Sequence, residues 1–252
     1  MTGLRENRVK RKLQAGDIAT VISGHNSPDV IDFLGSIGFD GVWLEGEHGP
    51  VDYAEIPDMT RACDVWGMTS IVRINLTLEG VLYRTLDLGA QGIVTPHIDT
   101  ADQARDVVNA TKFAPIGSRG MATSRQGYGV SDYYAKANDE TLVVVLIEDI
   151  LAVRNLKNIL EVDNIDVFFV APGDLSQSMG FVGQPTHPEV IETIDNTIQQ
   201  ITATGKIAGA LVNDETVEGY INKGARFLLN SWPEWVIANG KDYLGKVYSA
   251  ST

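Results

Sequence analysis

Six residues near the middle of the chain read Val143-Val144-Val145-Leu146-Ile147-Glu148, an apolar run closed by a carboxylate. Short apolar runs without polar alternation are typical of parallel strands, because helices cover both faces of such a sheet. Two further runs end in a similar way: Val167–Val170 is followed closely by Asp174, and Gly41–Leu44 leads directly into Glu45-Gly46-Glu47-His48. Strands that end in acids and a histidine predict a hard-cation site on the rim of a parallel sheet.

Eight such runs alternate with helical segments along the chain. The predicted strands are Ile18–Ser23, Gly41–Glu45, Thr69–Arg73, Gly92–Thr95, Leu142–Ile147, Val167–Val170, Ile207–Val212 and Phe227–Leu229. This alternation predicts an α/β protein with a (β/α)8 TIM barrel. A doubly wound sheet is the alternative. The sequence argues against it, since no Gly-x-Gly-x-x-Gly follows an early strand and no Gly-x-x-x-x-Gly-Lys-Ser/Thr occurs.

Capping residues and glycines place helices between the strands. Predicted helices cover Pro28–Ile37 after Ser27, Leu78–Leu88 after Thr77, Thr100–Thr111, His187–Thr204 after a capping box at Thr186, and Asp214–Asn222. The connection Pro115–Asn138 is unusually long for a compact domain, and long structured loops are often functional. A subunit contact is the equally weighted alternative for this loop.

Composition indicates one globular domain over residues 1–252, with residues 1–14 as an N-terminal extension. The net charge of −13 disfavours nucleic acid as a partner, because an acidic surface repels phosphate backbones. No stretch is apolar enough for a signal peptide or a span, so we expect no membrane partner and a cytoplasmic location. The single cysteine, Cys63, is predicted to be a small buried hydrophobic residue rather than a nucleophile.

Glu148 and Asp174 are the predicted ligands of a divalent cation. Mg²⁺ usually takes one or two carboxylates and keeps positions for water and substrate, which suits two acids on neighbouring strands. A solvated pair of acids is the alternative. We prefer the metal site because a charge directly after a buried strand is costly without a partner.

Other polar side chains follow strands on the same rim. His48 lies on a strand-to-helix turn, and an imidazole is a natural general base near pH 7. Arg73 ends its strand and needs an anionic partner, for which we favour substrate over a fixed carboxylate. His97 and His25 also face this rim but are ranked lower, and His187 is predicted to lie on the surface.

Covalent catalysis is disfavoured. No lysine ends a strand, so no amine is placed for a Schiff base in the pocket. No Gly-x-Ser-x-Gly occurs, and Cys63 has no triad context.

Several of these residues belong to longer motifs. They are Gly38-Phe39-Asp40, Glu45-Gly46-Glu47-His48-Gly49-Pro50, Val72-Arg73, Asp87-Leu88-Gly89-Ala90, Gly117-Ser118-Arg119-Gly120, Ile147-Glu148 and Ala171-Pro172-Gly173-Asp174-Leu175-Ser176-Gln177-Ser178-Met179-Gly180. Over residues 8–245 the chain resembles the metal-dependent pyruvate aldolases of the 4-hydroxy-2-oxoheptanedioate aldolase type. That family also contains 2-dehydro-3-deoxyglucarate aldolase and 2-keto-3-deoxy-rhamnonate aldolase.

The resemblance implies a TIM barrel of the phosphoenolpyruvate/pyruvate superfamily that binds Mg²⁺ or Mn²⁺, with Co²⁺ as a further candidate. It implies that the metal is held by Glu148 and Asp174, and that His48 is the catalytic histidine. Asp87 matches the acid paired with that histidine, and Arg73 matches the enolate-binding arginine. Family members form hexamers, often with exchanged C-terminal helices, so a homohexamer is expected.

The same resemblance places the pyruvate carboxylate at the backbone of Ala171, Pro172 and Gly173, beside Asp174. Glu45 and Glu47 are predicted to support His48 or a metal-bound water. The implied reaction is reversible cleavage of a 4-hydroxy-2-oxoacid to pyruvate and an aldehyde. Oxaloacetate decarboxylation or a related 2-oxodiacid lyase reaction is the alternative, and a non-catalytic oxoacid-binding barrel is a third possibility.

Three positions depart from the family pattern. Leu146 stands where many members have glutamine, and Val21-Ile22 stands where many have tryptophan. Asn230-Ser231-Trp232-Pro233 replaces a Gly-x-Asp type of stretch after the eighth strand. We therefore transfer the metal site from the family to this chain, but not the aldehyde selectivity or the reaction outcome.

Overall fold

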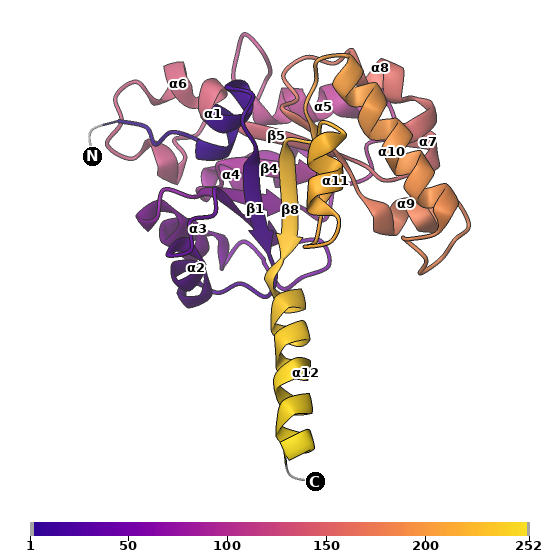
Figure 1. Ribbon diagram of the computed structural model, residues 1–252. Coiled ribbons are helices and arrows are strands. Elements are labelled where there is room, and N and C mark those ends of the chain that lie inside the picture. The colour runs from indigo at the N-terminus through magenta and orange to yellow at the C-terminus, as the bar shows by residue number, and fades with distance from the viewer. Residues whose placement is uncertain (1–2, 251–252) are drawn as a thin grey trace.

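The computed structural model describes residues 3–250, and its strands close into a parallel barrel in the order β1 to β8 (Figure 1). The strands are β1 Ala19–Ser23, β2 Gly41–Glu45, β3 Thr69–Arg73, β4 Gly92–Thr95, β5 Leu142–Ile147, β6 Val167–Val170, β7 Ala208–Leu211 and β8 Phe227–Ser231. Each pairs with the next along the chain, and β8 closes on β1. The predicted (β/α)8 barrel is confirmed, and the doubly wound sheet is excluded.

The helices alternate with these strands. They are α1 Arg8–Gln14, α2 Pro28–Gly35, α3 Ile56–Val65, α4 Glu79–Asp87, α5 Ala101–Thr111, α6 Tyr133–Glu140, α7 Ile150–Arg154, α8 Leu156–Leu160, α9 Pro172–Ser178, α10 Pro188–Ala203, α11 Val217–Asn222 and α12 Trp232–Ala250. In the described residues no helix has both the length and the apolar character that crossing a membrane requires.

One predicted cap is confirmed and one is wrong. The Ser27 hydroxyl accepts the N–H of Val30 at 3.2 Å, as expected for a cap of α2. Thr77 does not cap α4, because its hydroxyl donates to the carbonyl of Pro96 instead, at 3.2 Å. The helix therefore begins one residue later than predicted, at Glu79.

The cap of α10 also differs from the prediction. The N-cap is His187 rather than Thr186, and the His187 Nδ1 accepts the N–H of Glu189 at 3.3 Å. The ring of His187 stacks on Phe181, with 3.8 Å between the ring centroids. This stacking holds the imidazole at the helix start, where it takes the acceptor role that a threonine hydroxyl usually has.

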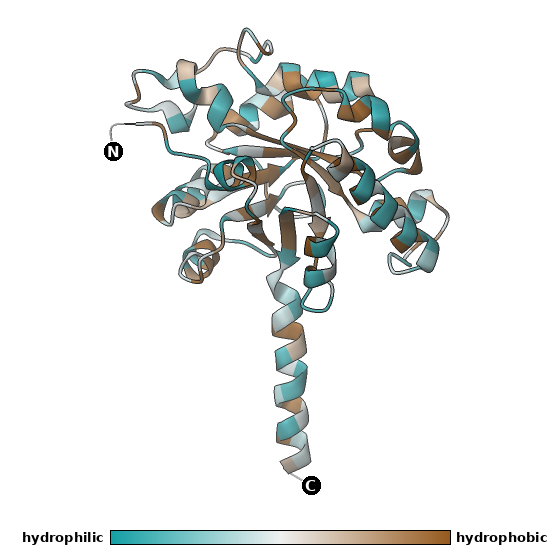
Figure 2. Ribbon diagram, turned by 45° about the horizontal axis from the view of Figure 1, so that its top comes forward, coloured by the Kyte–Doolittle hydropathy of each residue, from teal (hydrophilic) through white to brown (hydrophobic). Residues whose placement is uncertain are grey.

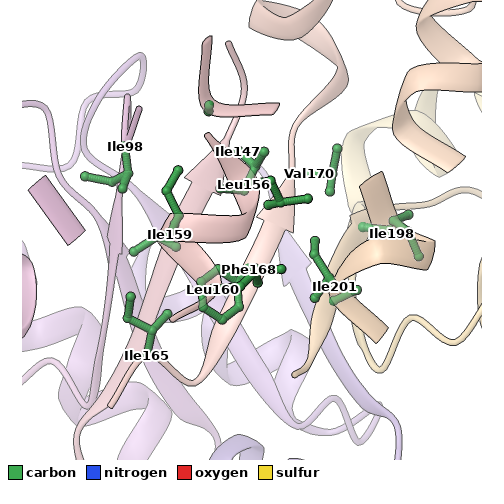
Figure 3. Close-up of a cluster of buried hydrophobic side chains, with 14 of the residues drawn as sticks. Ile98, Ile147, Leu156, Ile159, Leu160, Ile165, Phe168, Val170, Ile198 and Ile201 are labelled. Carbon is green, nitrogen blue, oxygen red and sulfur yellow. The ribbon is translucent and has the colours of Figure 1, made fainter. Parts of the chain in front are cut away.

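Side chains on each strand alternate between the barrel interior and the helices, as a strand requires. In β5 the interior set is Leu142, Val144 and Leu146, and the outer set is Val143, Val145 and Ile147. The outer residues pack against helices in a continuous layer, part of which is drawn in Figure 3. Both faces of the strands are thus buried, which explains why they appear as uninterrupted apolar runs. In Figure 2 the strands are mostly brown and the helices mix teal with brown.

A wide aromatic side chain inside the barrel requires a glycine opposite. Phe169 points inward from β6, and a Cβ on Gly209 of β7 would lie 2.6 Å from its ring. The Trp43 ring of β2 lies 5.5 Å from the Phe169 ring, between centroids. These two aromatic rings fill the interior just below the rim at which the strands end.

The N-terminal extension is part of the barrel domain. Val9 and Leu13 of α1 are buried in the interior cluster, so α1 closes the end of the barrel at which the strands begin. Asp40 fixes the helix through Arg8 at 2.8 Å and Lys12 at 2.9 Å.

A buried lysine lies close to this closed end. The Lys112 Nζ donates to the carbonyls of Asn138 and Thr141 at 2.8 and 2.7 Å, and the Lys10 Nζ donates to the second carbonyl at 2.8 Å. Burial lowers the pKa of Lys112 to about 7; Asp166 partly opposes the shift and Lys10 adds to it. The unfolded chain therefore binds more protons than the folded chain above pH 7.

We expect the free energy of unfolding to rise with pH between 7 and 9, by about 2 kcal/mol from Lys112. Chemical denaturation of the native chain and Lys112→Met at several pH values isolates this contribution, because all other groups cancel in the comparison. The exposed Lys157→Met is the matched control. Equal pH slopes for the native chain and Lys112→Met would contradict the assignment.

The connection between α5 and α6 lies on the side of the barrel away from the strand ends. Arg125 in this connection contacts Asp64 of α3 at 2.7 Å. Met121 and Tyr128 project from it with exposed fractions of 80% and 73%. This placement favours the subunit-contact alternative over an active-site loop of the same chain.

The last helix does not pack on the barrel as the other helices do. Helix α12 leaves the strand-end rim and projects away from the barrel (Figure 1), and none of its residues is buried. Its apolar side chains recur at seven-residue spacing, Val236 with Tyr243 and Ile237 with Leu244, and all four are exposed. This helix was expected only from the resemblance.

Candidate active site

The inward-facing positions change from apolar to polar at the rim where the strands end. Trp43 and Leu146 face the barrel interior. The alternation of a strand returns to the same face two residues later, at Glu45 and Glu148. All parallel strands of a barrel end at one rim, so a polar layer lies directly above an apolar floor.

Arg73 is bound by two fixed carboxylates. Strand register pairs it with Glu45, and the Arg73 Nε lies 3.0 and 2.8 Å from the two Glu45 oxygens. The Arg73 Nη2 lies 2.8 Å from Glu45 Oε2, and Nη1 lies 2.9 Å from Glu47 Oε2. The fixed-carboxylate partner considered for Arg73 is thus present, and its contact with substrate stays a prediction. Among residues 3–250 the guanidinium forms hydrogen bonds through its Nε–H, and the four N–H groups of Nη1 and Nη2 make ionic contacts without a hydrogen bond.

Glu45 organises both Arg73 and the turn that carries His48. Its Oε1 accepts the backbone N–H groups of Glu47 and His48 at 2.9 and 3.0 Å, and its Oε2 accepts the Trp43 indole N–H at 3.1 Å. Burial alone would raise the pKa of Glu45, but the Arg73 guanidinium and these donors lower it. One ionised carboxylate thus fixes the arginine and the histidine turn together.

Glu47 joins Arg73 to His97. The Glu47 Oε1 lies 3.6 Å from His97 Nε2. Its Oε2 is close to Arg73, but the two are not aligned for a hydrogen bond, and this buried oxygen has no hydrogen-bond partner among residues 3–250.

His97 has a larger part in the site than the sequence suggested. Its backbone has φ of +54°, a left-handed conformation that is uncommon for residues other than glycine. Its N–H donates to Glu148 Oε1 at 2.8 Å, and its Nδ1 lies 3.4 Å from the same oxygen. The imidazole therefore lies between Glu47 and Glu148 and links the ends of β2, β4 and β5.

Glu148 is a buried carboxylate with one unsatisfied oxygen. Burial raises its pKa to about 7, the N–H and imidazole of His97 partly oppose this, and the carboxylates of Asp174 and Glu47 add to it. Within the described part of the chain, Glu148 Oε2 has no hydrogen-bond partner. Such an oxygen is costly in a folded protein, and a bound cation would remove the cost.

The backbone beside Asp174 is open to a ligand. Ala171, Pro172, Gly173 and Asp174 line one cavity where β6 passes into α9. Amide groups in the first turn of a helix have no acceptor within that helix. No atom lies within 4 Å of the place where a Gly173 side chain would begin, so a ligand can approach this backbone closely.

The donor set fits a hard divalent cation with few protein ligands. Across residues 3–250, no three His, Cys, Asp or Glu side chains converge into a ready-made metal cluster. Glu148 and Asp174 are close enough to interact electrostatically, and Glu148 offers an unsatisfied oxygen. Mg²⁺ commonly binds through one or two carboxylates with water and substrate completing the shell, which agrees with this pair.

His48 reaches the same cavity but does not meet its implied partner. Its side chain is exposed and lines the cavity with Glu45 and Arg73. Asp87 instead accepts the Arg119 Nη2 at 2.6 Å. In the described residues no hydrogen bond joins Asp87 to His48. The reason is topological: α4 runs away from the strand-end rim, so Asp87 at its end approaches the opposite rim.

The cavity is large, at about 1140 Å³. Its floor is formed by Trp43, Leu146, Phe169 and Leu229 from the barrel interior. Above this floor the cavity is lined by Glu45, Asp174, Arg73 and His48. Beyond them the cavity continues along β7, α11 and the first turns of α12. The chemistry that these groups support is binding of an oxoanion or oxoacid beside a divalent cation, with a base within the same cavity.

The profile of the HpcH/HpaI aldolase/citrate lyase family matches residues 21–231. The chain belongs to this family. It is therefore a carbon–carbon lyase, and the matched region spans all eight strands apart from the first two residues of β1.

Two relatives within the family carry specific names. The hydroxypyruvate/pyruvate aldolase of Roseobacter denitrificans is 38% identical over 202 residues, which cover 78% of this chain and 79% of the relative. The 4-hydroxy-2-oxo-heptane-1,7-dioate aldolase of Escherichia coli is 33% identical over 251 residues, which cover 97% of this chain and 96% of the relative.

Solved structures agree with the fold of the HpcH/HpaI family. The HpcH/HpaI aldolase of Desulfitobacterium hafniense superposes with a TM-score of 0.86 at 26% identity, over 93% of this chain and 95% of that one. The citrate synthase SbnG has a TM-score of 0.88 at 23% identity, over 98% of this chain and 99% of that one, and supports the barrel alone.

Sequence reasoning missed some residues at this family's site. Trp43 and Phe169 were treated only as parts of strands, yet they form the cavity floor. Counting back two residues from Glu45 would have identified Trp43 as the inward neighbour. Nothing in the sequence pattern reveals the left-handed backbone of His97.

Proposed function

We propose that this enzyme reversibly cleaves a 4-hydroxy-2-oxoacid to pyruvate and an aldehyde with a divalent metal, Mg²⁺ or Mn²⁺, and Co²⁺ as a further candidate. The observation that carries the proposal is the unsatisfied, buried oxygen of Glu148 beside Asp174, on the rim that also holds Arg73 and His48. The names of the two relatives support an oxoacid substrate.

Glu148 and Asp174 would hold the metal, and the first-turn amides of α9 would hold the substrate carboxylate. A metal bound there would supply a Lewis acid for the 2-keto oxygen. The N–H groups of Arg73 that form no hydrogen bond among residues 3–250 are available to the same oxygen. Because Glu45 and Glu47 fix the guanidinium before substrate binds, little reorganisation is needed as charge develops.

His48 acts as the general base. It removes the proton from the 4-hydroxyl, directly or through a water, and the aldehyde forms as the C3–C4 bond breaks. The bonding electrons move toward the 2-keto oxygen and give the enolate of pyruvate. A proton then returns to carbon 3, and in the synthetic direction the same steps run in reverse.

Pyruvate release from 4-hydroxy-2-oxoacids tests this assignment. We expect activity to be lost after treatment with EDTA and restored by Mg²⁺ or Mn²⁺, because among residues 3–250 the candidate ligands are the two carboxylates of Glu148 and Asp174. His48→Ala should lower kcat by about 10²–10⁴-fold, as removal of a general base does. Full activity in EDTA would reject the metal. Carbon dioxide from oxaloacetate without aldehyde from any hydroxy acid would instead support decarboxylation.

We also propose that the chain functions as an oligomer, as the hexamers of the resembled aldolases suggest. The exposed stripe of α12, formed by Val236, Ile237, Tyr243 and Leu244, is an apolar surface that a second copy would cover. A pairing of Asp87 with His48 also needs a second copy, because these residues approach opposite rims of one barrel.

Introducing charged residues into the apolar stripe of α12 tests whether this stripe holds the oligomer together. Ile237→Glu combined with Leu244→Glu should lower the mass measured by light scattering and lower kcat, while the barrel itself stays folded by circular dichroism. Lys241→Glu on the same helix is the control for added negative charge. A native chain that is monomeric at micromolar concentration and fully active would contradict the proposal.

A further inference from the structure

The cavity extends well beyond the space that an oxoacid needs. Ligand sites for small molecules commonly occupy about 300–1000 Å³, and this cavity reaches about 1140 Å³. The part distant from Arg73 is walled by the turn after β7, by α11 and by the start of α12. With the oxoacid end bound beside Arg73, as proposed above, this outer part is the space left for the aldehyde fragment, so its chemistry would decide which aldehydes fit.

The outer wall is acidic. Asp214 and Glu215 line it from the turn after β7, and Glu234 lines it from the first turn of α12. Asp214 is held in place, because its Oδ1 accepts the indole N–H of Trp235 at 3.0 Å. Three carboxylates from two separate elements therefore face one space.

Among residues 3–250, no uncommitted lysine or arginine of the cavity balances these acids. Arg73 and Lys223 are the arginine and the lysine that line it. The Lys223 Nζ lies 2.6 Å from Asp195, and Arg73 is bound by Glu45 and Glu47. In the described part of the chain, the wall thus offers no uncommitted positive charge to an anionic aldehyde.

The same wall offers uncharged hydrogen-bonding groups. Thr186, Ser231, Asn213 and Asn230 line the cavity. Among residues 3–250, the two hydroxyls and the two amide nitrogens of these side chains form no hydrogen bond with another protein atom. Such groups suit hydroxyls on a substrate, which both donate and accept.

We propose that the enzyme takes neutral, hydroxyl-bearing aldehydes and discriminates against aldehydes that end in a carboxylate. This inference rests on the proposed aldolase function. An anionic end would lose hydration beside three carboxylates without gaining a counter-charge. A diacid such as the heptane-1,7-dioate named for the Escherichia coli relative would place its second carboxylate against this wall.

A matched pair of aldehydes isolates the effect of a carboxylate at the far end of the substrate. With pyruvate as donor, kcat/KM for 4-oxobutanoate is compared with that for its methyl ester, which carries the same reacting group without the remote charge. We expect the ester to be preferred by at least tenfold in low salt and glyceraldehyde to be a good substrate. Because the acids are exposed, the preference should shrink as ionic strength rises. An equal or higher kcat/KM for 4-oxobutanoate would overturn the proposal.

Reversing the charge of two acids on the cavity wall provides a second test. Glu215→Lys combined with Glu234→Lys should lower the ester preference by at least tenfold. Glu218→Lys is the matched control, since Glu218 lies on α11 and is exposed but does not line the cavity. If Glu218→Lys changes the preference as much as the double variant does, the effect is general charge and the wall is not responsible.

A reaction that needs no aldehyde distinguishes failure of the acidic-wall proposal from failure of the aldolase function on which it rests. Exchange of the pyruvate methyl protons with deuterium needs the enolate site but no aldehyde. Absence of exchange in the native enzyme would count against the aldolase function. Exchange together with equal use of both aldehydes would overturn only the acidic-wall proposal.

Discussion

Replacing Glu148 with glutamine is expected to abolish most catalysis while raising the stability of the metal-free protein. Glutamine keeps the shape of the side chain and can still accept the N–H of His97, but it removes one of the two negative ligands. Loss of electrostatic stabilisation at a reacting centre commonly costs about 10²–10³-fold in kcat, and we expect at least this loss.

The gain in stability follows from the pKa. Burial raises the pKa of Glu148 from 4.5 to about 7, so between these values the folded chain binds more protons than the unfolded chain. The free energy of unfolding therefore falls as pH rises through this window and stays reduced above pH 7. Glu148→Gln removes the penalty, which corresponds to on the order of 1–3 kcal/mol at pH 8 in EDTA.

The loss of activity and the gain in stability can both be measured on one preparation of the variant. Steady-state pyruvate release gives the activity, and chemical denaturation in EDTA at pH 5 and pH 8 gives the stability. Asp149→Asn is the control, because it neutralises the adjacent residue and keeps an efficient cap for α7. A variant that loses activity because it unfolds would show that Glu148 is structural.

The barrel and its rim could be predicted from the sequence because the hydrophobic patterns of strands and of helices decide them. Apolar runs such as Leu142–Ile147 identify strands that are buried on both faces, and their parallel arrangement brings Glu45 and Glu148 to one rim. Those inferences need only local pattern and the rules of barrel topology.

Other features depend on contacts that no local pattern encodes. The local pattern at Arg73 does not show that Glu45 binds it, because the register of β2 against β3 is what places the two residues side by side. Asp87 has a charged partner in Arg119, which comes from a distant loop. Whether α12 packs on its own barrel depends on how it leaves the rim after Ser231, which the sequence pattern leaves undetermined.

Replacing Arg73 with lysine is expected to lower kcat/KM by about 10²–10³-fold, or about 3–4 kcal/mol, although the charge is kept. The guanidinium contacts both oxygens of Glu45 and one oxygen of Glu47 through three different nitrogens. A lysine is a single point charge on a flexible stem and cannot bridge the two carboxylates while also facing the substrate. The lost activity should therefore lie mainly in kcat, since we propose that backbone amides of α9, and not Arg73, bind the oxoacid carboxylate.

Arg84→Lys is the matched control, because Arg84 is exposed and lies over the Tyr53 ring at 4.1 Å, a contact that lysine can also make. Separate kcat and KM values for pyruvate, together with the deuterium exchange of its methyl group, report directly on the enolate step. If Arg73→Lys retains normal exchange and loses only thermal stability, the arginine holds Glu45 and Glu47 together and takes no part in catalysis. If exchange falls with kcat and the fold is intact, the preorganised guanidinium is part of the catalytic site, and Glu45 and Glu47 are the residues that position it.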